Sequence, residues 1–176
     1  RVTEFAYQSG GPDYFYRLTV GVGPWVDAVF PPAVNPGKPA PVTLYGRNLP
    51  GGRTVPNVQV DGRPVEAVTV TVNPPSAAGS LTFRGRVAPT AALLDGFEYR
   101  HVTPAGTSND VVIGVTDAKV VAETDAPNDT VETAQDIPAP CEVAGRIDKR
   151  SDRDYFAFTA KKGDTYTLDL IGERLG

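Results

Sequence analysis

The sequence predicts an all-β protein built from antiparallel β-sandwiches. It contains 18 glycines and 17 prolines among 176 residues, and these residues favour frequent turns over long helices. Many of the remaining apolar residues are valine, phenylalanine and tyrosine, which suit the pleated surface of a strand. No window has the apolar stripe of an amphipathic helix. The hydrophobic content of 40% is sufficient for packed cores in a chain of this length.

The first 22 residues are predicted to form one or two strands. Residues 2–7 and 14–20 are rich in valine and aromatic side chains, and a turn with two glycines and a proline separates them. Two strands cannot bury a core by themselves. They are therefore either the end of a preceding unit or an N-terminal hairpin of the unit that follows.

A second unit, residues 23–121, contains about seven short strand candidates. In residues 42–45, valine and leucine alternate with threonine and tyrosine, which is the period of a half-buried strand. Asp61-Gly62 predicts a two-residue hairpin turn, because both positions of such a turn need positive φ. The candidates are residues 24–32, 42–49, 58–65, 68–72, 81–87, 96–100 and 111–115. This profile is typical of an immunoglobulin-like sandwich.

The opening of the second unit has a distinctive order of prolines and strands. Pro24 precedes an apolar strand that ends in Phe30-Pro-Pro, and the run Val-Thr-Leu-Tyr-Gly-Arg-Asn-Leu then covers residues 42–49. This order is similar to that of the immunoglobulin-like IPT/TIG modules, over about the first half of the unit. The resemblance implies a rigid sandwich that presents loops and strand edges.

The last third of the chain is an acidic, turn-rich run that leads into a strand with large rings. Its characteristic residues are Pro127-Asn-Asp-Thr130, Ala134-Gln135, Val143-Ala-Gly145 and Asp152-Arg-Asp-Tyr-Phe-Ala-Phe158. Over residues 122–176 this pattern resembles the opening of the bacterial pre-peptidase C-terminal domain. That domain is a small β-sandwich that follows the catalytic unit of many secreted peptidases and recurs in large surface proteins of planctomycete-like bacteria.

This resemblance implies a fold for residues 122–176. They would form the N-terminal half of a jelly-roll-like sandwich, with strands at 152–159 and 165–170 around a turn at 161–164. Tyr166, Leu168 and Leu170 are expected to face inward. Such a half sandwich leaves strand faces and edges uncovered, so it is expected to depend on residues or a partner beyond Gly176.

The resemblance also gives an organisation for the whole chain. Residues 1–22 would be the C-terminal strands of an upstream domain of the same kind, and residues 23–121 a complete immunoglobulin-like domain. Residues 116–126 would be a linker into the third unit, residues 122–176. The chain is therefore expected to be part of a longer protein.

Charge and composition exclude several classes of partner. Residues 122–176 carry 12 acidic and 7 basic side chains, whereas nucleic-acid binding needs a concentrated basic face. The negative charge of this region favours a cation as its ligand. No apolar run is long enough to span a membrane. Cys141 is the only cysteine, so no intrachain disulfide can form, and its flanks favour an inert core thiol.

No sequence signature of catalysis is present. The chain lacks the nucleophile elbow, the zinc-protease helix motif and the phosphate-binding loop. His101, the single histidine, is expected at a strand edge, and a zinc site would have to consist mostly of carboxylates. The sequence therefore predicts a protein that is not an enzyme.

Oxygen-rich side chains of the acidic region predict a calcium site. Ca²⁺ takes six to eight oxygen ligands and tolerates irregular loops. The candidate ligands are Asn128, Asp129, Asp152 and Asp154. Collagen-binding relatives of the pre-peptidase family bind calcium at comparable positions, but Thr124 and Ala126 stand here where those relatives have ligands. The alternative is that the Asx residues cap turns.

The expected function is that of a non-catalytic binding, adhesion or spacer segment of a large secreted or cell-surface bacterial protein. Two alternatives remain open: an accessory substrate-binding module of a secreted hydrolase, and a structural subunit of an extracellular assembly. The expected partners are neighbouring domains of the same protein, another copy of the chain, or an extracellular polymer or protein.

Overall fold

The computed structural model describes residues 10–16, 18, 20–76, 95–147, 149 and 151–172. The strands predicted at 2–7 and 81–87 lie outside these ranges. The described chain is all-β, with one short 3-10 turn, η3 (Val131–Thr133), as its only helical element. Within these ranges no helix is long and apolar enough to cross a membrane. The fold class predicted from the sequence is therefore confirmed.

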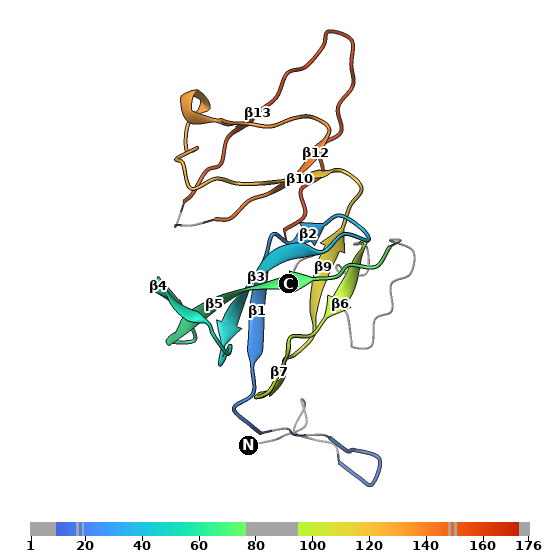
Figure 1. Ribbon diagram of the computed structural model, residues 1–176, viewed down its shortest axis with the longest axis vertical. Helices are drawn as coiled ribbons and strands as arrows, with labels where there is room; N and C mark the ends of the chain where they lie inside the picture. Colours follow the sequence, from blue (N-terminus) through green and yellow to red (C-terminus); the bar gives the residue numbers. More distant parts are fainter. Residues whose placement is uncertain are drawn as a thin grey trace.

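Two sheets build the sandwich in the middle of the molecule (Figure 1). The first has the order β1-β3-β5-β4 with antiparallel neighbours. The second has the order β2-β9-β6, in which β6 is antiparallel and β2 parallel to β9. The strands are β1 (Trp25–Phe30), β2 (Ala33–Val34), β3 (Ala40–Arg47), β4 (Arg53–Val60), β5 (Arg63–Val72), β6 (Gly96–Tyr99) and β9 (Val111–Val115). A small hairpin, β7 (Val102–Thr103) and β8 (Gly106–Thr107), extends one end.

The core lies between these two sheets. β3 alternates as the sequence predicts, with Val42 and Leu44 fully buried and their neighbours turned outward. Ile113 of the second sheet is also fully buried, so the two sheets share one core. The buried cluster consists of Val26, Val34, Val42, Leu44, Leu49, Val72 and Ile113.

The turn predicted at Asp61-Gly62 is confirmed. These two residues connect β4 to β5, and the flanking Val60 and Arg63 are paired across the hairpin. Both turn residues have positive φ, 52° for Asp61 and 72° for Gly62, as a tight two-residue hairpin requires.

A side chain closes the outer edge of β1. The Asn109 amide donates from Nδ2 to the Val26 carbonyl at 2.8 Å, and its Oδ1 accepts the Val26 N–H at 2.8 Å. Asn109 lies just before β9, so it ties the first sheet to the second. It therefore gives Val26 the two hydrogen bonds that a neighbouring strand would otherwise provide.

A second, smaller unit follows at one end of the sandwich (Figure 1). It contains β10 (Lys119–Ala122) parallel to β12 (Cys141–Ala144), and β11 (Gln135–Asp136) parallel to β13 (Phe156–Ala157). The sequence predicts residues 116–126 as a linker, and in the structure they contain β10, which pairs with β12. We call residues 119–172 the C-terminal unit.

The hairpin expected in the C-terminal unit forms only in part. The chain does turn at residues 161–164, where the Asp164 N–H donates to Lys161 O at 3.2 Å. The rings of Phe158 and Tyr166 then lie 5.0 Å apart. Residues 165–170, however, form no strand, and Leu168 and Leu170 are 83% and 93% exposed. The predicted inward orientation of these leucines is therefore wrong.

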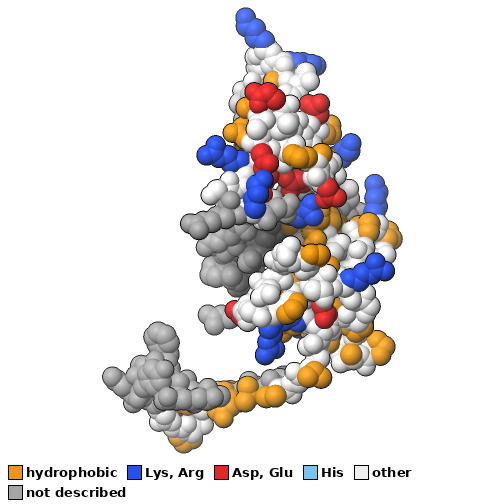
Figure 2. Space-filling model, turned by 90° about the vertical axis from the view of Figure 1, so that its left-hand side faces the viewer, with side chains coloured by type: hydrophobic (Ala, Val, Ile, Leu, Met, Phe, Trp, Pro, Cys, Tyr) orange, Lys and Arg blue, Asp and Glu red, His pale blue; other side chains and the backbone are white. Residues whose placement is uncertain are grey.

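The segment before β1 extends away from the sandwich, at the end opposite the C-terminal unit (Figure 1). Residues 14–20 were predicted as a strand, but the described residues among them form none. Their apolar side chains face solvent, and Figure 2 shows hydrophobic atoms gathered along this segment. Among the described residues no strand pairs with this segment, and its apolar side chains do not by themselves produce a sheet.

Candidate functional site

The candidate site is the junction between the sandwich and the C-terminal unit. We define the connecting segment as residues 116–124, which include β10 at the start of the C-terminal unit. The junction is this segment together with the side chains that bind it. Hydrogen bonds hold this segment at both ends. At its start, the Thr116 N–H donates to Val34 O at 3.1 Å, and at its end the Glu123 N–H donates to Ala144 O at 2.8 Å.

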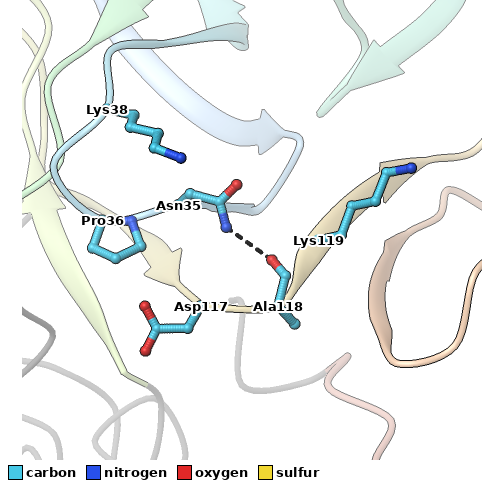
Figure 3. A pocket seen from close by; sticks show the side chains of 6 residues that line it. All are labelled: Asn35, Pro36, Lys38, Asp117, Ala118 and Lys119. Atoms are coloured by element: carbon cyan, nitrogen blue, oxygen red, sulfur yellow. Dashed lines mark hydrogen bonds between the residues drawn. The ribbon is translucent and has the colours of Figure 1, made fainter.

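Asn35 fixes the start of the connecting segment. It follows β2 and precedes a Pro-Gly turn in which Gly37 has a φ of 65°. Its Nδ2 donates to the carbonyls of both Thr116 and Ala118, at 2.8 Å each. Figure 3 shows the bond to Ala118. One side chain of the sandwich therefore binds two backbone carbonyls of the path into the C-terminal unit.

A shallow pocket of about 410 Å³ adjoins Asn35. Lys38 lies on one side of it and Lys119 on the other, with Asp117 below (Figure 3). Pro36 and Ala118 complete the lining. Because both charge signs are present and the pocket is open, its lining gives no specific ligand chemistry.

Glu123 fixes the other end of the segment. It is only 8% exposed, and it is surrounded by donors. Its Oε1 accepts from Asn128 Nδ2 at 3.1 Å, and its Oε2 accepts from the Arg146 backbone N–H at 2.7 Å. A buried carboxylate with bonds to both oxygens stabilises the local backbone and would be costly to leave unpaired.

The Gln135 side chain binds the residues on either side of Glu123. Its Oε1 accepts the Thr124 N–H at 2.9 Å, and its Nε2 donates to Ala122 O at 3.1 Å. The side-chain amide thus takes the place of a strand backbone next to β10. The connecting segment is therefore bonded along its length and differs from a flexible linker.

Arg146 joins the two units directly. Its guanidinium carbon lies 4.8 Å from the centroid of the Phe30 ring, at the end of β1, within the range of a cation–π contact. The same guanidinium donates to Asp125 Oδ1 at 3.2 Å. The C-terminal unit thereby contacts the sandwich through a side chain whose backbone N–H is already held by Glu123.

The four predicted calcium ligands lie in one region but have protein partners. Asn128 binds Glu123, and its own carbonyl accepts the Tyr155 N–H at 2.9 Å. Both oxygens of Asp129 lie 3.0 Å from Lys149 Nζ, and an oxygen of Asp152 lies 3.6 Å from the same nitrogen. Asp154 lies half-buried two residues further along.

Lys149 is the cation that the structure places between these carboxylates. Its hydrogen bond to Asp129, with a smaller contribution from Asp152, raises the pKa of the ammonium group. Among the described residues, no three His, Cys, Asp or Glu side chains converge as a metal-binding group would. Binding of Ca²⁺ stays a prediction, for which Asp129 and Asp152 would first have to release Lys149.

The two residues with reactive side chains lie elsewhere. The His101 ring contacts the Tyr99 hydroxyl at 3.4 Å, and its backbone is bonded to Ser108 on both sides. Burial raises the pKa of Tyr99. Cys141 is half-buried at the start of β12. The His101 contacts suit the strand edge predicted for this residue. Cys141 begins a strand but is only half-buried, so it is not the core thiol that its flanks favoured.

Sequence reasoning missed the residues that hold the junction. Asn35 stands before Pro-Gly and reads as a turn residue, while Arg146 and Lys149 read as solvated charges. Glu123 directly precedes Thr124, one of the two positions at which the calcium-binding relatives have ligands. The only local signal is that Glu123 directly follows the short apolar strand β10.

Comparison of the chain with protein-family models, with curated proteins and with solved structures gave no match.

Proposed function

We propose that this chain is a non-catalytic spacer segment of a large secreted or cell-surface protein, in which the sandwich and the C-terminal unit are held at a fixed angle. The observation that carries this proposal is the pair of 2.8 Å hydrogen bonds from Asn35 to Thr116 and Ala118. They bind the one segment whose rotation would change the angle between the units.

The energy of these contacts is large enough to matter. A hydrogen bond of this kind contributes about 1 kcal/mol, so the two bonds of Asn35 contribute about 2 kcal/mol. Each 1.4 kcal/mol is a factor of about ten in population, so Asn35 alone favours the fixed arrangement roughly 30-fold. The Arg146 contact with Phe30 adds to this from the other side of the junction.

The shape of the molecule supports the same role. Residues 10–22 and the C-terminal unit lie at opposite ends of the sandwich (Figure 1). A pulling force applied at the two ends would therefore act along the long axis, through the sandwich and then the junction. The separation of the two ends depends on the same parts. The secreted or surface location and the pre-peptidase character of residues 122–176 are parts of the proposal that rest on the sequence resemblance.

The proposal is tested by measuring the distance between two spin labels. We would place cysteines at Thr71 of the sandwich and Thr159 of the C-terminal unit, both exposed, in a Cys141→Ala background. The expected result is one narrow distance distribution, which broadens in Asn35→Ala because the connecting segment is released. Asn73→Ala, which removes an exposed asparagine, is the matched control and should leave the distribution narrow.

A broad distribution in the chain with native Asn35 would contradict the proposal. So would an Asn35→Ala distribution as narrow as that of the control, because the contact that carries the argument would then be unimportant for the angle.

A further inference from the structure

The outer face of the first sheet carries an exposed indole in a fixed orientation. Trp25 is 50% exposed at the start of β1. Its Nε1 donates to Asp27 Oδ1 at 2.9 Å, and the same oxygen accepts from Arg47 Nη2 at 3.0 Å. Asp27 and Arg47 are themselves largely covered, with side chains 20% and 24% exposed. An ion pair therefore holds the ring of an otherwise free surface side chain.

The outward face of the same sheet contains a second ring. Trp25 pairs with Arg47 across β1 and β3, and Tyr45 lies two residues before Arg47 on the same, outward face of β3. The neighbours of Tyr45 in the sheet are small, Ala28 on β1 and Ala67 on β5. Tyr45 therefore has no large side chain directly opposite it on either neighbouring strand.

We propose that Trp25, Asp27, Arg47 and Tyr45 form a binding site for a neutral β-linked glycan. A pyranose ring in such a glycan presents a flat face of C–H groups, which carry a partial positive charge and suit the negative face of an indole. The described bonds use only Oδ1 of Asp27 and one guanidinium nitrogen of Arg47, which leaves other polar atoms of the pair for sugar hydroxyls.

The size and charge of the site favour a glycan over a protein partner. A stable protein interface buries more than about 1,000 Å² around an apolar centre, whereas the rings of the proposed site are one indole and one half-buried tyrosine. The site is electrically neutral because Asp27 and Arg47 pair with each other, so an anionic polymer gains nothing here. This site goes beyond the spacer role and does not depend on it.

The test uses the single tryptophan of the chain as its reporter. Cellohexaose, xylohexaose and chitohexaose would be titrated separately into the full chain at up to millimolar concentrations, with Trp25 fluorescence and its indole N–H resonance recorded. We expect saturable changes with at least one of them. Calorimetry with the same sugar should show binding weakened about tenfold by Trp25→Ala, the effect of losing one stacking interaction.

Two further variants separate the site from general effects. Asp27→Ala keeps the indole but releases it, and is expected to weaken binding severalfold. Phe15→Ala removes a more exposed aromatic outside the sheet face and should leave binding unchanged. Circular dichroism would verify that each variant is folded.

Three results would overturn the proposal. The first is no response of Trp25 to any of the three sugars, and the second is unchanged affinity in folded Trp25→Ala. The third is a Trp25 response to a tryptic casein digest with none to the sugars. The last result would assign the indole to a peptide partner instead.

Discussion

Replacement of Asn109 by alanine tests how the two sheets of the sandwich are joined. Asn109 supplies the Val26 N–H and carbonyl with one hydrogen bond each, at 2.8 Å, and the Val26 side chain is 1% exposed. In Asn109→Ala both backbone groups lose their partner where water has little access.

The expected loss of stability follows from these two groups. Leaving a buried donor or acceptor unsatisfied costs about 1–3 kcal/mol, and water recovers part of this at a sheet edge, so we expect a loss of about 2–4 kcal/mol. For a sandwich of this size the melting temperature should fall by roughly 10–20 °C. A loss of that size is a large part of the total stability of a typical domain, about 5–15 kcal/mol.

The assay is urea unfolding followed by the fluorescence of Trp25, which is adjacent to Val26. Asn73→Ala is the matched control and should change stability by no more than about 0.5 kcal/mol, as exposed substitutions usually do. Asn109→Asp keeps the acceptor for Val26 N–H but sets a second oxygen against the Val26 carbonyl. It should therefore destabilise at least as much as alanine near neutral pH. A loss below about 0.5 kcal/mol in Asn109→Ala, or full tolerance of aspartate, would refute the reasoning.

Three further predictions concern the hairpin, an ion pair and the C-terminal segment. Gly62→Ala should destabilise the sandwich by about 1 kcal/mol, because Gly62 has a φ of 72°. Gly23→Ala is the control and should not destabilise it, because Gly23 lies in open space without a positive φ. Equal effects of the two substitutions would contradict the turn. The ion pair of Lys149 with Asp129 raises the pKa of Lys149. The contribution of this pair to folding stability is therefore fully present below the unfolded pKa of about 10.4 and is lost as pH rises through the folded pKa. An NMR titration of the Lys149 side chain should show a midpoint that falls in Asp129→Ala, and an unchanged midpoint would refute the pairing. Amide hydrogen exchange should be much faster in residues 165–170 than in β3, which is bonded on both sides, and equal protection would mean that the C-terminal segment is independently stable.

Features of the sandwich that depend on neighbouring residues could be predicted from the sequence. The alternation of Val42 and Leu44 with outward residues identified β3 and its buried face. Successive side chains of a strand point to opposite faces, so the apolar set determines which face is buried. Asp61-Gly62 identified the β4–β5 hairpin, because few residue pairs tolerate its backbone angles.

Features that depend on residues far apart could not be predicted. Asn35 binds carbonyls 81 and 83 residues away, and no local pattern marks an asparagine as a long-range donor. Residues 165–170 alternate as well as β3 does, yet remain exposed, because a strand needs a paired edge and a covered face. Residues 116–126 contain β10 for the same reason. β10 pairs with β12, whose residues lie 22 positions further along the chain.

The fixed junction is tested most directly by ¹⁵N spin relaxation on the full chain. If the contacts of Asn35, Glu123 and Arg146 hold the two units as one body, amides of β3 and β5 and amides of β10 and β12 will report the same rotational tumbling time. Asn35→Ala should separate the two values. A distinctly shorter tumbling time for β10 and β12 in the unmodified chain would mean that the units rotate independently, and would contradict the spacer function proposed for this protein.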